Sequence, residues 1–308
     1  MTTPTPEARF IITASLTDEQ PKHFRTLPTT YLNRAVTLSA SGQPSEMGFY
    51  TLHNKIQEFG QTHIINLRQE HHFFVNKSAI TYYHGEENDA NKGLSKDEIL
   101  SQLRPLIDQI HTAGSIQIAT GRQKQKIQGV KVTTFEKTVP MTVQETSSED
   151  EVLEKLEIPY TFFPITDHNM KALGERIDAL IQTVLSRLAT GTKWIHFHCQ
   201  GGKARSAMAM LLSAILLEAK TKSLKEIERI FTLNQDFHFE ARKYKKFTVF
   251  FEHYYTYCKE NNPQEISWSA WAKKKGVYES ALEVLPENRQ DKARVKELRK
   301  NRATLHKA

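Results

Sequence analysis

The sequence predicts an α/β fold in which a small β domain interrupts a core of alternating strands and helices. Three observations lead to this fold. Short apolar runs alternate with amphipathic segments along most of the chain. Residues 115–143 instead alternate β-branched with polar residues and are broken by glycine, which predicts an antiparallel β unit. An apolar run at 194–199 leads through a short turn into an apolar helical segment at 206–219.

The individual elements follow from local signals. Residues 1–30 contain four prolines and predict an irregular arm. Residues 95–114 have a helical pattern in which Pro105 predicts a kink or a restart. The other predicted elements are, in chain order, a helix at 45–60, strands at 62–67 and 78–84, a helix start at 147–157, a strand at 159–165, a helix at 172–191, a strand at 194–199, a helix at 206–219 and helical, aromatic-rich chain at 223–262.

Composition favours an anionic partner. The chain has 308 residues, 39% of them hydrophobic, a formal charge of +7 and a pI of about 9.2. That balance suits nucleic acid, acidic lipid or a phosphorylated small molecule. Nucleic acid has only the charge in its favour, because the aromatic residues lie in core-like runs rather than between basic residues as a stacking platform requires. We therefore expect an anionic small molecule and no nucleic acid.

Two features bear on the compartment. Cys199 and Cys258 are the two cysteines, so no disulfide framework is implied and a reducing compartment is expected. The first residues lack a signal-peptide pattern, and no run approaches the roughly 20 apolar residues of a membrane span. We expect a cytoplasmic location and no membrane span. Delivery by a specialised secretion system, which needs no N-terminal signal, stays open.

A cysteine stands where the strand at 194–199 turns into a helix. The turn reads Cys199-Gln-Gly-Gly-Lys-Ala-Arg205. Ligands bind at the carboxyl ends of strands in open parallel sheets. A glycine-containing turn into a helix points backbone N–H groups inward, where they bind a tetrahedral oxyanion and favour an ionised thiolate. The spacing therefore predicts a phosphate bound over a cysteine nucleophile.

The side chains of this turn fit the same chemistry. Arg205 can direct two N–H groups at phosphate oxygens, and Gly202 permits close backbone approach. The Ser206 hydroxyl can donate to the cysteine sulfur and help it to leave. The alternative, a buried structural cysteine beside an unrelated arginine, is weakened by His198 before the cysteine and by the strand–loop–helix setting.

A nucleotide-binding loop of the Walker type is excluded. Phe197 occupies the position of its first glycine. Ala204 replaces the serine or threonine that binds Mg²⁺.

The turn is the signature His-Cys-x-x-Gly-x-x-Arg-Ser/Thr of cysteine-dependent phosphatases, the protein tyrosine phosphatase superfamily. Over about residues 23–260 the chain resembles one branch, the protein tyrosine phosphatase-like phytases, which hydrolyse inositol polyphosphates. The landmarks that carry this resemblance lie at 24–25, 65–76, 79–95, 166–168 and 194–199.

The resemblance implies a phosphatase core with a central, mostly parallel sheet flanked by helices and an inserted small β-barrel-like domain. The implied division is an N-terminal arm at 1–30, a phosphatase core at 31–76 and 151–262, the inserted β domain at 77–150 and a helical basic C-terminal extension at 263–308.

The resemblance also implies catalytic roles. Cys199 is the nucleophile, Arg205 the phosphate clamp and Asp167 the general acid on a loop that closes over the substrate. An inositol alkoxide is a poor leaving group, so a carboxylic acid has to protonate it. A helix N-cap is the structural alternative for Asp167. No metal or cofactor is implied. The remaining residues of the phosphate-binding loop are Gln200, Gly201, Gly202, Lys203, Ala204 and Ser206.

The resemblance places further basic residues around the other phosphates of the substrate. These are Arg25, Arg68, His168, Lys243, Lys245 and Lys246. Arg25 and Arg68 match motif positions. The three lysines match only by region, and a solvated lysine face explains them equally well.

The loop departs from the usual sequence of the family. Lys203 adds a fixed positive charge where lipid phosphoinositide phosphatases also carry lysine. Ala204 and Lys171 stand where glycine and proline are usual. The added charge favours a polyphosphate or phosphoinositide over phosphotyrosine.

The sequence thus predicts a bacterial, metal-independent phosphatase of myo-inositol polyphosphates that works through a phosphocysteine. A phosphoinositide or phosphotyrosine/dual-specificity phosphatase with the same catalytic residues is the first alternative. An inactive phosphate-binding module is a more remote one.

Overall fold

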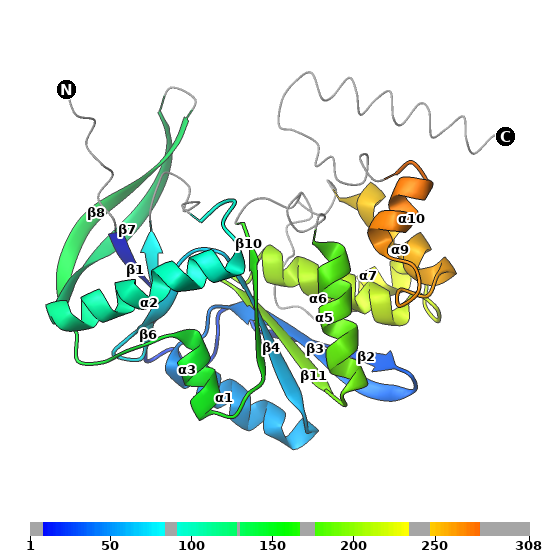
Figure 1. Cartoon of the computed structure of the whole chain (residues 1–308), viewed down its shortest axis with the longest axis horizontal. Helices are drawn as coiled ribbons and strands as arrows, with labels where there is room; N and C mark the ends of the chain where they lie inside the picture. Colours follow the sequence, from blue (N-terminus) through cyan, green and yellow to red (C-terminus); the bar gives the residue numbers. More distant parts are fainter. Residues whose placement is uncertain (1–8, 84–90, 128–129, 167–175, 234–246, 278–308) are drawn as a thin grey trace.

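The computed structural model describes residues 9–83, 91–127, 130–166, 176–233 and 247–277, which form two sheets with helices around them (Figure 1). The central sheet has the strand order β10-β4-β11-β3-β2. Its strands are β2 Arg25–Tyr31, β3 Arg34–Gly42, β4 Thr62–Arg68, β10 Tyr160–Ile165 and β11 Trp194–Cys199. All neighbouring pairs are parallel except β2 with β3. The predicted central, mostly parallel sheet flanked by helices is therefore confirmed.

Helices cover one face of this sheet with the largest hydrophobic core. They are α5 Ile177–Ala189, α6 Arg205–Glu218, α7 Leu224–Leu233, α9 Thr248–Glu260 and α10 Trp268–Lys274 (Figure 1). The helix α6 is buried on nearly all sides, which explains why its sequence is apolar throughout. Trp268 of α10 is 1% exposed and packs edge-on against Tyr254 of α9.

The other face of the central sheet is covered by α1 Glu46–Ile56 and α3 Glu149–Lys155. A single 3₁₀ turn, η1 Gln57–Phe59, continues α1 to Gly60. The helix α1 begins at Ser45, whose hydroxyl accepts a hydrogen bond from the Gly48 N–H. Phe49, Leu52 and Ile56 of α1 are buried in a second core that includes Ile64 of β4 and Trp194 of β11.

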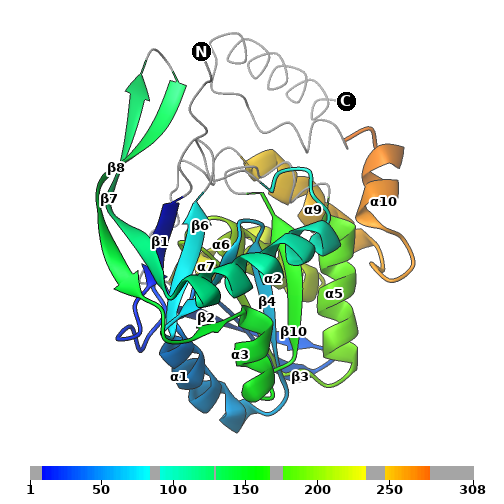
Figure 2. The same cartoon turned by 60° about the vertical axis from the view of Figure 1, so that its left-hand side comes forward.

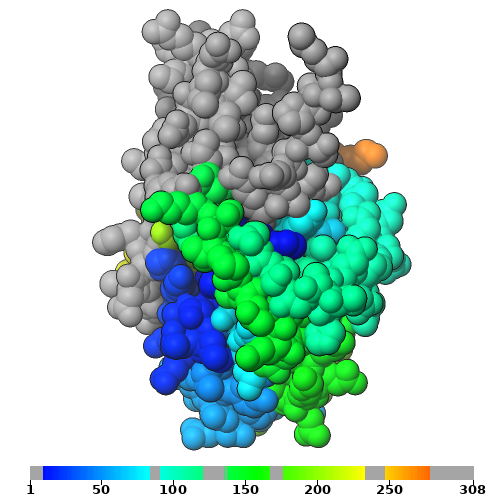
Figure 3. Space-filling model, turned by 90° about the vertical axis from the view of Figure 1, so that its left-hand side faces the viewer, coloured from blue at the N-terminus to red at the C-terminus, as the bar shows by residue number. Residues whose placement is uncertain are grey.

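A second sheet lies beside this layer and has the order β8-β7-β1-β6-β5-β9. Its strands are β1 Arg9–Ala14, β5 His72–Val75, β6 Ser78–Tyr83, β7 Ser115–Ile127, β8 Val130–Thr142 and β9 Thr146–Ser147. The helix α2 Lys96–Ala113 packs Ile99, Leu103, Ile107 and Ile110 toward the core. The β7–β8 hairpin is antiparallel and projects from the body (Figure 2), and Figure 3 shows the molecule from the side on which the hairpin lies.

The second sheet confirms the antiparallel β unit predicted at 115–143. Closure into a barrel is not confirmed, because β8 and β9 form the two edges of this sheet among the described strands. The sheet also takes in β1, from the predicted arm, and β5, which precedes residue 77. The division into domains stays a prediction.

Residues 9–31 differ from the predicted irregular arm because they hold two strands, β1 and β2. The prolines misled the prediction. Pro28 lies in β2, the edge strand of the central sheet, where a residue without an N–H is tolerated. Pro105 likewise neither ends nor restarts α2 and lies on its exposed side. Among the described residues, no helix is long and apolar enough to cross a membrane.

Candidate active site

Cys199 is the last residue of β11, in the middle of the central sheet, and α6 begins at Arg205. Ile195, Phe197 and Cys199 point to the core that α6 covers, whereas His196 and His198 point to the opposite face. Ala204 is the N-cap of α6 and no side chain caps it among the described residues. The N–H groups of the first turn are therefore oriented toward the loop, as an oxyanion site requires.

The loop rests on the end of the neighbouring strand β3. Gly201 forms an isolated bridge with Gly42, and the Gln43 N–H donates to the Gln200 carbonyl at 3.2 Å. Gly202 has φ 72°, and a Cβ built on it would lie 2.4 Å from Gly42 N and 2.7 Å from Ser41 C. The left-handed φ and the close contact with the β3 backbone both exclude a side chain at Gly202, so the shape of the loop requires glycine there.

We expect Gly202→Ala to distort this loop. The methyl group would meet backbone rather than a flexible side chain, so we expect a loss of about 1–3 kcal/mol in the free energy of unfolding, together with a loss of the chemistry that depends on this loop. Gly201→Ala is the matched control, because a Cβ there has no atom within 4 Å. Urea unfolding and turnover of both variants test this. Equal behaviour of the two variants would show that the contact with β3 does not shape the loop.

The sulfur of Cys199 lies 3.4 Å from the Ser206 hydroxyl oxygen. That hydroxyl also lies 3.1 Å from the Ser41 carbonyl, to which it can donate. A serine has a single hydroxyl proton. The proton can therefore serve either Ser41 or a charged sulfur, and rotation of the hydroxyl switches between them.

Arg205 is buried and held by a carboxylate that sequence reasoning did not identify. Its two terminal nitrogens donate to the two oxygens of Glu70 at 2.7 and 2.8 Å. It also donates to the Ile165 carbonyl at 2.9 Å. Burial alone would raise the pKa of Glu70, but Arg205 and Arg68 more than offset burial and lower it. Glu70 thus stays ionised and fixes the guanidinium of Arg205 beside the loop.

Arg68 is the second partner of Glu70. Its Nε donates to Glu70 at 3.1 Å, its Nη1 to Gln43 at 3.1 Å and its Nη2 to Thr81 at 2.7 Å. The side chain of Arg68 has no exposed surface. Arg68 therefore lies behind Glu70, and direct contact with a substrate phosphate would require it to move.

A second buried network supports His198, the residue before the cysteine. Its Nε2 lies 2.8 Å from Glu149, at the start of α3, and Glu149 also accepts from Gln43 at 2.9 Å. Burial alone would raise the pKa of Glu149, but His198 and His72 more than offset it and lower it. Gln43 contacts both networks and thereby links Arg68 to Glu149.

Basic groups gather at the cysteine loop. Burial lowers the pKa of Arg25 to about 10, while interaction with Cys199 acts in the opposite direction. Lys203 is exposed, and burial followed by Lys203 and Arg25 lowers the pKa of His23. The charge of Arg25 therefore reaches Cys199, and the charges of Arg25 and Lys203 both reach His23. Five predicted site residues, Asp167, His168, Lys243, Lys245 and Lys246, lie outside the described residues.

Glu70 and Glu149 are the site residues that sequence reasoning missed. Glu70 lies within the landmark at 65–76, two residues after a strand that ends at the edge holding Cys199, and this position was the available signal. Glu149 had no comparable signal, because it resembled an acid in the first turn of an ordinary helix.

This chain is similar to known proteins in sequence and in fold. The family model of protein tyrosine phosphatase-like phytases, described as inositol hexakisphosphate, matches residues 65–217. The effector protein hopD2 of Pseudomonas syringae pv. tomato (strain ATCC BAA-871 / DC3000) is 25% identical over 227 residues, which cover 70% of this chain and 47% of that protein.

Solved structures of related folds include a tandemly repeated protein tyrosine phosphatase-like phytase of Mitsuokella multacida. It has a TM-score of 0.67, 20% identity, and coverage of 90% of this chain and 49% of that one. A complex of the Mitsuokella myo-inositol phosphatase with myo-inositol-(1,3,4,5)-tetrakisphosphate gives the same values. A phytase of this type from Bdellovibrio bacteriovorus has a TM-score of 0.58, 22% identity, and coverage of 84% and 92%. The chain spans about half the length of the Pseudomonas and Mitsuokella proteins.

Proposed function

We propose that this chain, which the family model of protein tyrosine phosphatase-like phytases matches over residues 65–217, is a cysteine phosphatase that removes phosphate from myo-inositol polyphosphates without a metal. The observation that carries this proposal is the position of Cys199 between the uncapped start of α6 and the Arg205–Glu70 pair. A nucleophile, an oxyanion site and a fixed cation meet there.

The proposed reaction has two displacements. The Cys199 thiolate attacks phosphorus, a sulfur–phosphorus bond forms, and the ester oxygen–phosphorus bond breaks. Asp167 gives its proton to the departing inositol oxygen. Asp167 then takes a proton from water, which attacks the phosphocysteine and releases inorganic phosphate and the thiolate. The Ser206 hydroxyl, 3.4 Å from the sulfur, is placed to stabilise the departing thiolate.

The substrate class is argued from charge. A monophosphate needs only the loop and Arg205, whereas a polyphosphorylated ring meets further cations. Lys203 in the loop is exposed and supplies one, and Arg25, although buried, interacts with Cys199. Arg68, predicted to bind substrate, is better placed to hold Glu70 because it is buried. Substrate contact stays a prediction for the remaining basic residues, His168, Lys243, Lys245 and Lys246. Delivery by a specialised secretion system also stays a prediction, and the similarity to an effector protein supports it.

Phosphate release tests the proposal. We expect inositol hexakisphosphate to be hydrolysed faster than a phosphoinositide in vesicles or a phosphotyrosine peptide, with the same rate in the presence of a chelator. Faster hydrolysis of the lipid or the peptide would favour a phosphoinositide or phosphotyrosine/dual-specificity phosphatase with the same catalytic residues. Binding without turnover of any substrate would favour an inactive phosphate-binding module.

We expect Lys203→Gln to raise KM for inositol hexakisphosphate much more than KM for p-nitrophenyl phosphate. A contact with a distant phosphate stabilises ground state and transition state alike, so its loss acts mainly on KM. The difference should shrink with added salt, since exposed charges are screened over about 8 Å at physiological ionic strength. Equal losses on both substrates would mean that Lys203 shapes the loop instead of contacting further phosphates.

A further inference from the structure

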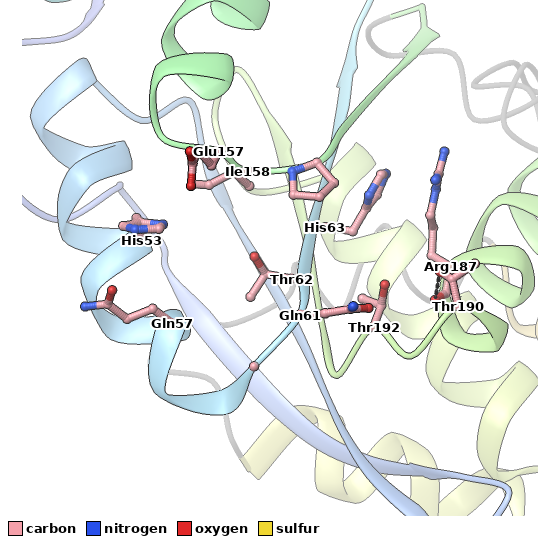
Figure 4. A pocket seen from close by; sticks show the side chains of 12 residues that line it. His53, Gln57, Gln61, Thr62, His63, Glu157, Ile158, Arg187, Thr190 and Thr192 are labelled. Carbon is pink, nitrogen blue, oxygen red and sulfur yellow. Dashed lines mark hydrogen bonds between the residues drawn. The ribbon is translucent and has the colours of Figure 1, made fainter.

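A cavity of about 380 Å³ lies at the amino-terminal edge of the central sheet. It is lined where β4 and β10 begin and where α1 and α5 end (Figure 4). Thr192, just before β11, also lines it, whereas Cys199 is at the far end of β11. Six strand residues rise about 3.3 Å each, so roughly 20 Å separate this cavity from the cysteine loop. The cavity is therefore a separate site.

Three nitrogen atoms of its lining residues are enclosed and lack a hydrogen-bond partner among the described residues. They are Nδ1 of His53, Nδ1 of His63 and Nε of Arg187. His63 is only 1% exposed, and its other ring nitrogen is 2.7 Å from the Thr161 hydroxyl. Buried polar atoms in folded proteins are nearly always hydrogen-bonded to protein, water or ligand. The unsatisfied nitrogens therefore indicate a polar occupant.

The chemistry of His63 and Arg187 indicates what this occupant carries. Burial, followed by the charge of Arg187, lowers the pKa of His63 to about 4, so its ring is neutral. When Thr161 donates to Nε2, the ring proton resides on Nδ1, which then donates as well. Figure 4 shows His63 beside Arg187. Two adjacent donors, one of them cationic, suit a carboxylate or phosphate oxygen.

Arg187 alone would not indicate a ligand, because it lies in the last turn of α5, where a cation complements the helix dipole. His63 needs a separate explanation, since it is neutral and almost fully buried. Glu157 lies on the other side of the cavity from Arg187 (Figure 4) and adopts a left-handed φ of 55° directly after α3, where glycine is usual. Its carboxylate accepts hydrogen bonds from hydroxyl or amino groups.

We propose that this cavity binds a small polar metabolite with a carboxylate or phosphate group. The acid group contacts Arg187 and His63, and hydroxyl or amino groups face Glu157. The volume lies at the lower end of the range of small-molecule pockets, about 300–1,000 Å³, and the lining is mostly polar. Ile158 and Pro159 are its apolar residues.

Histidine side-chain NMR tests this, with inorganic phosphate and citrate as probes and His63→Gln to assign the His63 signals. We expect one or both probes to shift these signals saturably, in the full chain and equally in Cys199→Ser, which separates this cavity from the cysteine loop. The probe that acts identifies the acid as phosphate or carboxylate. In Arg187→Gln, which removes a charge-assisted bond, the apparent affinity should fall about tenfold or more.

Arg229→Gln is the matched control, because Arg229 is an exposed arginine of another helix, α7, and does not line the cavity. In Arg229→Gln, the probes should shift the His63 signals with the same apparent affinity as in the wild type. Arg187→Lys keeps the charge at the end of α5 and is the second variant should Arg187→Gln not fold. It should weaken the response severalfold. No shift of the His63 signals with either probe, or an unchanged response in the folded Arg187 variants, would overturn the proposal and leave water as the occupant.

Discussion

Cys199→Ser should abolish turnover of inositol hexakisphosphate and preserve its binding. A serine hydroxyl is a weak nucleophile at neutral pH unless a base activates it, whereas a thiolate attacks phosphorus directly. The groups that hold phosphate stay in place, because the loop rests on Gly42 of β3 and Arg205 is fixed by Glu70. Turnover and binding should therefore separate in this variant.

The measurements are phosphate release and calorimetric titration with inositol hexakisphosphate. Cys258→Ser is the matched control. The Cys258 thiol is 2% exposed in the core, and burial raises its pKa, so it stays protonated and has no access to substrate. The control should keep its turnover as long as it folds. Comparable turnover by Cys199→Ser and the wild type would contradict a phosphocysteine intermediate.

The cysteine loop could be predicted because its signals are local. The 26 residues from Trp194 to Ala219 contain, in this order, a β-branched and aromatic run, two glycines and an apolar helix. The loop takes its shape from that order, and Gly202 proves to be the glycine that the contact with β3 requires. Local sequence patterns also predicted most helices, such as α2, which begins with a Ser95–Glu98 capping box.

The supporting carboxylates could not be predicted in the same way, because their partners are distant in sequence. Glu70 meets Arg205 across 135 positions, and Glu149 meets His198 across 49. Neither pairing leaves a spacing pattern in the chain. The surroundings of Arg68 could not be predicted for the same reason. Its position in a motif suggested substrate contact, but the packing of β4 against the second sheet encloses it beside Thr81.

Glu70→Gln should cost about 3–5 kcal/mol in the free energy of unfolding, because it leaves two buried arginines without their shared carboxylate. Arg68 and Arg205 each pair with Glu70 in the wild type, and both are enclosed. The amide offers one acceptor oxygen in place of two, so Arg205 also loses its paired hydrogen bonds. We expect kcat to fall together with the free energy of unfolding, because the Arg205 guanidinium is no longer fixed beside Cys199.

Glu218→Gln is the matched control for this variant. Glu218 is also buried and ion-paired, but its partner Lys222 is partly exposed and lies in the turn after α6, away from the loop. It should lose less stability and keep its kcat. Urea unfolding and turnover of both variants separate the two effects. If Glu70→Gln kept wild-type kcat while losing stability, Glu70 would be a structural ion-pair partner and not a positioning residue for Arg205.

The pH dependence of unfolding gives an independent test of the Glu70 pairing. The pKa of Glu70 is lowered in the folded protein, so its contribution to stability is present above the unfolded value of about 4.3 and is lost as pH falls below it. The wild type should therefore lose stability faster than Glu70→Gln on acidification through this range, and the difference between them should narrow. A constant difference between the two curves from pH 7 down to pH 3 would mean that the carboxylate is not the group on which the two arginines depend.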